Sequence, residues 1–186
     1  MLLPQKVIPS LIGFPKLIKM STASTKNETL AGLDCLKKAN CLSLKNPIEF
    51  GIFTDWDEAT VLLEHSFQQM KSKPEELEGG LLTTEAVLNP RSHREKMTEI
   101  IFEYFRVPKY FVQCQAMNAL YSEGLTTAMV VDCGEGLSTC VPITDGYLNP
   151  SAISRLDIGG REVNFQLMKL LSSKALFTTT YEQSFI

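Results

Sequence analysis

The segment from Thr126 to Pro142, TTAMVVDCGEGLSTCVP, constrains this chain more than any other stretch. Apolar residues crowd up to Asp132, a short turn with two glycines follows, and a second run begins at Leu137. Glycines let a backbone turn sharply and let its N–H groups approach a ligand closely. The segment therefore predicts a β-hairpin whose tip suits an anion such as phosphate, with a carboxylate placed to hold a metal ion through water. An ordinary hairpin turn is the alternative interpretation, because glycine-rich tips are common.

The composition is that of a folded domain and shows no excess of basic residues that would favour nucleic-acid binding. With 186 residues, 44% of them hydrophobic, the chain is long enough for one sizeable core, and its net charge of −3 argues against nucleic-acid binding. The five cysteines form no C-x-x-C pair and the two histidines complete no metal-ligand pattern, which predicts reduced thiols in a cytosolic protein. Pro4, Pro9 and Pro15 interrupt the apolar N-terminal stretch, which reads neither as a signal peptide nor as a membrane span.

Hydrophobic periodicity and capping residues predict alternating strands and helices. Pro9 favours an edge position for the first strand, and the polar residues 20–33 predict an exposed loop. Thr54 or Asp55 can cap the first long helix. The last helix carries an apolar stripe from Val163 to Leu171, and the order of elements fits an α/β core. Besides the hairpin, we expect strands at residues 7–14, 81–84, 110–113 and 152–158, and helices at residues 56–70, 92–105, 116–121 and 161–171.

Several blocks of the chain follow one another in an order known from one family. Asn46–Asp57 (NPIEFGIFTDWD), Leu82–Met97 (LTTEAVLNPRSHREKM), Gln113–Tyr121 (QCQAMNALY), the hairpin, Ser154–Glu162 (SRLDIGGRE) and Phe177–Thr180 (FTTT) resemble the actin family in sequence and order. The resemblance is strong from Pro47 to Ile186 and weaker over residues 8–15. It implies an α/β, actin-like ATPase fold of the ribonuclease-H-like type. Local choices such as Gly124-Leu125 lean toward the actin-related proteins.

The resemblance also implies a chain truncated at both ends, with one lobe plus part of the second. Residues 1–45 would be the N-terminal strand and loop of the mobile outer lobe, residues 46–124 the α/β core of the first lobe, and residues 125–186 the phosphate-loop hairpin and the start of the second lobe. Nothing in residues 1–6 is similar to the family's first phosphate loop. We therefore expect an incomplete nucleotide site.

Residue roles follow from the resemblance and not from spacing. Gln115 matches the glutamine that orients the water attacking the γ-phosphate, and is the catalytic candidate. Asp132 matches the acidic residue near the hydrated Mg²⁺, and is the metal-site candidate, through water. Without the resemblance, Gln115 reads as a helix-start residue satisfied by backbone groups. The nucleotide-binding candidates are Asp132, Cys133, Gly134, Glu135 and Gly136.

Four positions depart from the family's pattern. Glu135 stands where the family has Asp, and Cys133 where it has Ser or another small residue. Thr139 stands where the family has a His that helps to order the catalytic water, and Phe50 stands where it has a His that is often methylated. Thr139 can hydrogen-bond but cannot titrate near neutrality. Weakened hydrolysis is therefore expected.

The resemblance implies an actin-related cytoskeletal protein of the cytoplasm that binds ATP with Mg²⁺ weakly or not at all, and is at most a weak ATPase. Its implied partners are actin or other actin-related subunits, as in an actin-nucleating complex, with no nucleic acid and no membrane. One alternative is a non-catalytic interaction module that keeps the actin-fold surface without nucleotide. Another ATPase of the same superfamily, such as a sugar kinase or chaperone, is a further alternative, against which the Asn46–Asp57 and Leu82–Met97 blocks argue.

Overall fold

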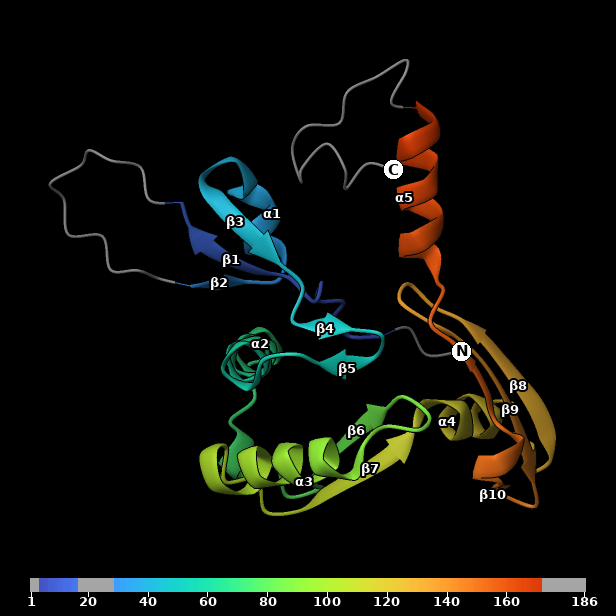
Figure 1. Cartoon of the computed structure of the whole chain (residues 1–186). Helices are drawn as coiled ribbons and strands as arrows, with labels where there is room; N and C mark the ends of the chain where they lie inside the picture. Colours follow the sequence, from blue (N-terminus) through green and yellow to red (C-terminus); the bar gives the residue numbers. More distant parts are fainter. Residues whose placement is uncertain (1–3, 17–28, 172–186) are drawn as a thin grey trace, which may run out of the picture. The chain divides into compact units, whose positions relative to one another are not determined.

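The computed structural model describes residues 4–16 and 29–171, which fall into two compact units (Figure 1). Among the described residues, the first unit comprises residues 4–16, 29–48, 53–73 and 170–171, and the second comprises residues 49–52 and 74–169. Within the described residues, no helix combines the length and the apolar character needed to cross a bilayer.

A three-stranded antiparallel sheet with the order β2-β1-β3 organises the first unit. The prediction of an edge strand over residues 7–14 was wrong, because β1 begins only at Ile12, after Pro9, and pairs on both sides. The predicted loop over residues 20–33 was also wrong at its end, which forms β2 and the start of α1; residues 20–28 lie outside the described residues. The elements are β1 (Ile12–Pro15), β2 (Leu30–Ala31), α1 (Leu33–Lys37), η1 (Ala39–Cys41) and β3 (Leu42–Lys45).

The long helix α2 (Trp56–Met70) confirms the predicted helix and its cap. The Asp55 carboxylate accepts from the N–H groups of Asp57 and Glu58, at 2.9 and 3.2 Å, so two backbone donors of the first turn are satisfied. The helix contributes Leu62 to a small core with Ile12 and Ala31 of the sheet. This core packs α2 against the strands of the sheet.

A parallel βαβ arrangement begins the second unit. Strands β6 (Leu81–Glu85) and β7 (Tyr110–Cys114) pair in parallel, and the connection contains α3 (Arg91–Glu99) and the π-helical segment η3 (Ile100–Tyr104). The two strands and the helix were predicted, although not the wider π turn. A short 3₁₀ turn, η2 (Pro74–Glu76), precedes them.

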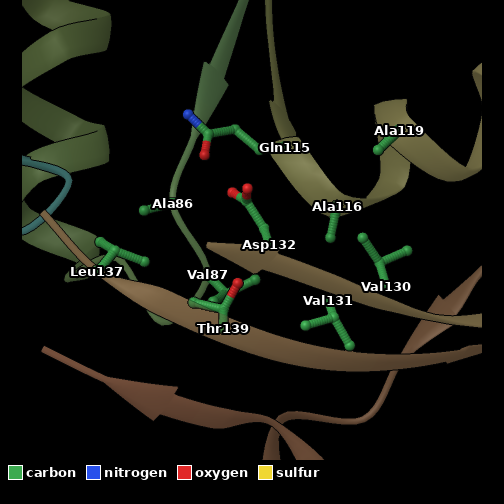
Figure 2. A pocket seen from close by; sticks show the side chains of 10 residues that line it. All are labelled: Ala86, Val87, Gln115, Ala116, Ala119, Val130, Val131, Asp132, Leu137 and Thr139. Carbon is green, nitrogen blue, oxygen red and sulfur yellow. The ribbon is translucent and has the colours of Figure 1, made fainter. Parts of the chain in front are cut away.

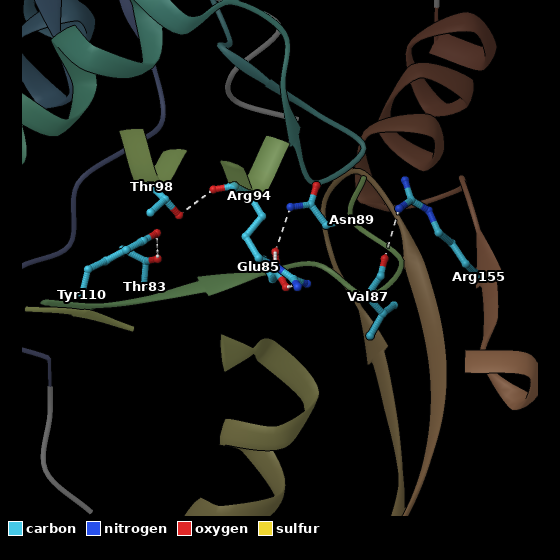
Figure 3. Close-up of polar contacts among 8 residues, drawn as sticks. All are labelled: Thr83, Glu85, Val87, Asn89, Arg94, Thr98, Tyr110 and Arg155. Carbon is cyan, nitrogen blue, oxygen red and sulfur yellow. Dashed lines mark hydrogen bonds and ion pairs between the residues drawn. The ribbon is translucent and has the colours of Figure 1, made fainter. Parts of the chain in front are cut away.

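Polar contacts fasten α3 over one face of these two strands (Figure 3). The hydroxyls of Thr83 and Tyr110 lie 2.7 Å apart across β6 and β7. At the end of β6, the Glu85 carboxylate forms an ion pair with Arg94 of α3 and accepts from the Asn89 amide at 2.9 Å. Burial raises the pKa of the Tyr110 hydroxyl. These contacts fix the loop that leaves β6, which contributes to the site described below.

The predicted hairpin is present, and its second strand, β9, is the central strand of an antiparallel sheet. Strand β9 pairs with β8 on one side and with β10 and β11 on the other. Helix α4 packs on β8 and β9 through a core of Val87, Ala116, Met117, Leu120, Val141 and Ile143. Gly124, with φ of 71°, terminates the helix as predicted. The elements are α4 (Gln115–Ser122), β8 (Ala128–Cys133), β9 (Ser138–Thr144), β10 (Tyr147–Leu148), η4 (Pro150–Ala152) and β11 (Ser154–Leu156).

The final described helix, α5 (Gly160–Leu171), confirms the helix predicted at residues 161–171 and begins one residue earlier. None of its residues is buried, and Val163 is 63% exposed. The predicted stripe therefore has no core to pack against among the described residues. A small two-stranded ribbon consists of β4 (Ile48–Glu49) and β5 (Ile52–Phe53), with Phe50 and Gly51 between them.

Candidate functional site

Three of the residues singled out in the sequence surround one cavity of about 280 Å³ in the second unit (Figure 2). Gln115, Asp132 and Thr139 supply its polar lining. Figure 2 shows their side chains directed at the same space from α4, β8 and β9. The rest of the lining is apolar and comes from Ala86, Val87, Ala116, Ala119, Val130, Val131 and Leu137.

Gln115 reaches the cavity because β7 ends immediately before it. Cys114 keeps extended backbone angles, and Gln115 then begins α4 as an exposed residue. A side chain just beyond the carboxyl end of a parallel strand lies at the edge where α/β folds place ligands. The position therefore suits a group that acts on a molecule in the cavity.

Asp132 and Thr139 are cross-strand partners in the β8–β9 ladder. Directly opposite residues of an antiparallel pair project to the same face, so both side chains reach the cavity side of the sheet. Their surroundings differ: Asp132 is exposed, whereas Thr139 is only 7% exposed. A carboxylate that keeps contact with water can hold a hydrated cation without a large desolvation cost.

The four residues of the hairpin tip do not line this cavity. Cys133 ends β8 opposite Ser138. The Gly134 N–H donates to the Leu137 carbonyl at 2.9 Å, which closes the turn. The carbonyls of Gly134 and Glu135 accept from the N–H groups of Gly160 and Arg161, at 3.0 and 2.9 Å. The tip is thus fastened to the first turn of α5, and one of its amides is already engaged.

At the start of α5, the backbone of Gly159 lies very close to the backbone of the hairpin tip. A Cβ on Gly159 would lie 2.7 Å from the Gly134 carbonyl oxygen and even nearer the carbonyl of Glu135, so only glycine fits without a shift. The Glu162 carboxylate accepts from the Gly159 N–H at 2.8 Å. That backbone hydrogen bond holds the pKa of Glu162 below its ordinary value, with a smaller contribution from Arg161.

Phe50, the position where the resembled family has a histidine, lies beside the same tip. Its φ of 48° is left-handed, and a Cβ on Gly136 would lie 3.4 Å from its backbone nitrogen. The guanidinium carbon of Arg161 stands 5.1 Å from the centroid of the Phe50 ring. An aromatic face in this place binds a cation, whereas it offers no hydrogen bond to a phosphate.

Arg155 is the residue that sequence reasoning missed. Its guanidinium donates to the carbonyls of Phe50 and Val87, at 2.9 and 3.3 Å, and pairs with Asp157 at 2.9 Å (Figure 3 shows the Val87 bond). The side chain is 16% exposed. One arginine therefore ties β11 to two loops that are distant in sequence, including the loop that supplies Val87 to the cavity. No local pattern signals this, because the partners lie 68 and 105 residues away.

The lining tests which groups could bind here. Asp132 carries the only charge among the lining residues, and it is negative. One carboxylate together with the Gln115 amide and the Thr139 hydroxyl fits a magnesium ion that keeps most of its water. Within the described residues, no cluster of three or more His, Cys, Asp and Glu side chains could enclose a metal directly. The set fits a phosphate poorly, because no cationic side chain lines the cavity.

Comparison with known protein families assigns the chain to one of them. The family model described as Actin matches residues 2–183. The chain therefore belongs to the actin family, and its mixed α/β elements are consistent with the actin-like ATPase fold. Members of this family generally bind ATP with Mg²⁺ and interact with actin or with other subunits.

Proposed function

We propose that this chain is an actin-related cytoskeletal protein of the cytoplasm that binds ATP with Mg²⁺ weakly and is at most a slow ATPase. In this proposal nucleotide acts mainly as a ligand that shifts conformation. The observation that supports it most directly is the cavity of about 280 Å³ whose polar lining is Gln115, Asp132 and Thr139. The proposal is that the nucleotide binding typical of the family takes place in this cavity.

Each polar residue has a role that its chemistry allows. Gln115 would orient the attacking water, because a neutral amide both donates and accepts. Asp132 would hold hydrated Mg²⁺ through a water molecule, and that ion, when bound, neutralises charge on phosphate oxygens. Thr139 would hydrogen-bond to water in the cavity but could not take up a proton near neutral pH. The tip residues Cys133 to Gly136 would approach the phosphates by their backbone.

Weak affinity follows from what surrounds these groups. The Gly134 N–H is engaged by the Leu137 carbonyl, so it cannot also donate to a phosphate without opening the turn. The Arg161 guanidinium near Gly136 lies over the Phe50 ring. With few preorganised donors, binding offsets little of the entropy lost on association.

Local residue choices favour one subfamily and one kind of assembly. Gly124-Leu125, Val130-Val131 and Leu156–Ile158 lean toward actin-related protein 2. We therefore propose a role as a subunit of an actin-nucleating complex, with actin or other actin-related subunits as partners. If the chain does not bind the purified subunits of such a complex in a pull-down, this assignment is contradicted.

Calorimetric titration of the whole chain with Mg-ATP tests the nucleotide proposal. We expect a dissociation constant weaker than about 1 μM, which corresponds to about −8 kcal/mol. Asp132→Ala should weaken binding further, whereas Gln115→Ala should slow phosphate release with unchanged affinity. Glu103→Ala removes an exposed acid of the same unit outside the cavity and serves as the matched control. A tighter constant, or equal effects of the Asp132 and Gln115 variants on affinity, would contradict the proposal.

A non-catalytic interaction module is the second candidate function. Thr139 and Phe50 in place of the family's histidines favour it. In that case Mg-ATP produces no heat of binding and no phosphate, and Asp132→Ala behaves like the unmodified chain in the same titration.

A further inference from the structure

A second cavity, of about 150 Å³, lies in the first unit, whereas the candidate site belongs to the second. Its walls come from the chain before β1, from helix α1 and from the second half of helix α2. The space corresponds to about five water molecules. It is about half of the volume at which pockets for drug-sized ligands begin, roughly 300 Å³. The cavity therefore suits a small polyatomic group and not a nucleoside.

Helix α2 supplies two polar side chains to this cavity. Leu62 is buried in the core of the unit, and His65 and Gln69 follow it at the spacing of one helix face. The face of α2 that packs on the sheet thus continues into the cavity wall. Gly32, just before α1, has a φ of 65°, and a Cβ there would lie 2.8 Å from Nε2 of His65. The close approach of this backbone limits where the imidazole ring can lie.

The lining of the cavity is positive on balance. Lys6 and Lys37 carry two positive charges against the one carboxylate of Asp34. That carboxylate forms an ion pair with Lys37 of the same helix, at 2.8 Å. The hydrogen bond and charge of Lys37 hold the pKa of Asp34 below its ordinary value, with smaller contributions from His65 and Lys38. Because Asp34 is paired within its own helix, Lys6 is the charge that has no counterpart in the lining.

Three of the lining side chains have donors that the described residues do not use. Within residues 4–16 and 29–171, the side chains of Lys6, His65 and Gln69 form no hydrogen bond and no ion pair. An ammonium, a ring N–H and an amide NH₂ all donate, and an ammonium cannot accept. Phosphate oxygens accept several such donors at once, and a cationic donor strengthens the bond. The donors that line this small space are therefore matched to an anion with several oxygens.

We propose that this cavity binds a phosphate group, which accepts from Lys6, His65 and Gln69, while Lys37 adds a second positive charge. The ligand is inorganic phosphate or the phosphate of a monoester such as phosphoserine, because both present the same oxygens. The site is separate from the proposed nucleotide cavity, since the two share no lining residue. Salt screens the exposed lysines, so we expect a dissociation constant of the order of 1 mM.

The two histidines of the chain make the test direct. NMR spectra of the whole chain contain ring signals from His65, in this cavity, and from His93, in α3 of the other unit. Inorganic phosphate, added at constant pH and ionic strength, should shift the His65 signals to saturation and leave the His93 signals unchanged. Sodium chloride should produce no saturable shift.

Variants then test whether the lining holds the anion. Lys6→Gln should weaken phosphate binding by at least about fivefold, and Lys6→Gln/Gln69→Ala by at least about tenfold. Lys38→Gln is the matched control, because it removes the same charge at the C-terminal end of α1 but from outside the cavity. It should change binding by less than about twofold. Unchanged amide signals of Ile12 and Leu62, in the core of the unit, show that each variant stays folded.

Phosphoserine with blocked ends, added in the same way, distinguishes the two sources of the phosphate. Binding tighter than that of inorganic phosphate assigns the site to phosphate monoesters, and equal or weaker binding assigns it to the free ion. Three results would overturn the proposal: no saturable shift of the His65 signals with either compound, an equal shift with chloride, or equal losses of binding in Lys6→Gln and Lys38→Gln.

Discussion

Asp132 and Thr139 face each other across β8 and β9, and both line the cavity that Gln115 enters from α4. Under the proposed function, Asp132 would hold hydrated Mg²⁺ through water, and a side chain at position 139 would lie next to it. The relationship makes Thr139 the most informative single position of the candidate site.

Thr139→His should raise the rate of phosphate release from Mg-ATP by at least about tenfold, because an imidazole can accept a proton or order water where a hydroxyl cannot. The cavity beside Thr139 leaves space for the larger ring. Phosphate release at saturating nucleotide is the measurement. Thr139→Val keeps the shape, removes the hydroxyl and should not raise the rate. An unchanged rate in the histidine variant, with the fold intact by circular dichroism, would show that Thr139 does not limit turnover.

Arg155→Lys should destabilise the second unit by about 1–3 kcal/mol, because lysine cannot reproduce the planar fork that reaches two carbonyls. The bonds at stake join Arg155 to Phe50 and Val87. Native-state hydrogen exchange of β9 amides measures the free energy of opening. Arg91→Lys is the control, since the Arg91 side chain is 89% exposed and its ion pair contributes little. Equal effects of both changes would rule out a special role for Arg155.

The sequence predicted the elements whose signals are local. Asp55 caps α2, and Gly124, with its positive φ, ends α4, because such signals depend on neighbouring residues. The glycines of the hairpin mark its turn. Strands β2, β4, β5 and β10 were not predicted, because each has two residues, too few for a periodic pattern. The four-residue strand β3 was also missed. The central position of β1 was missed because its pairing with β2 and β3 is not local.

The candidate site was predictable only in part. Gln115, Asp132 and Thr139 were singled out through the family resemblance, and the structure brings them to one cavity. The tip residues Cys133 to Gly136 do not line it. The carbonyls of Gly134 and Glu135 are engaged by α5, and the Gly134 amide by Leu137. Whether they contact nucleotide remains a prediction. Arg155 had no sequence signal, since its partners are brought near only by the fold.

Because of Glu162, the stability of the first turn of α5 should depend on pH. Its pKa is lowered by the Gly159 N–H bond, so the carboxylate form stabilises the folded state. This contribution is fully present above the unfolded-state pKa, near the ordinary glutamate value of 4.5, and is lost as the pH falls through the lower folded-state pKa. Carboxyl chemical shifts followed by NMR, together with amide exchange at Gly159, measure it. In the unmodified chain, the free energy of opening at the Gly159 amide should fall as the pH falls through this range. In Glu162→Gln it should not change with pH. If it does not change in the unmodified chain, the Glu162–Gly159 bond does not form in solution.

Gly159→Ala should break the junction between the hairpin tip and α5, because the added Cβ meets the backbone of Gly134 and Glu135 and neither can move without opening the turn. The Gly160 and Arg161 amides, which donate to these carbonyls, should then exchange with solvent at least about tenfold faster, as expected for local opening. Gly79→Ala is the matched control, since a Cβ there has no atom within 4 Å and the backbone is not left-handed. Protection at β9 should persist in both variants, because its ladder with β8 does not depend on α5. If the Gly160 and Arg161 amides stay protected in Gly159→Ala, the close approach of the two backbones is not what holds this junction together.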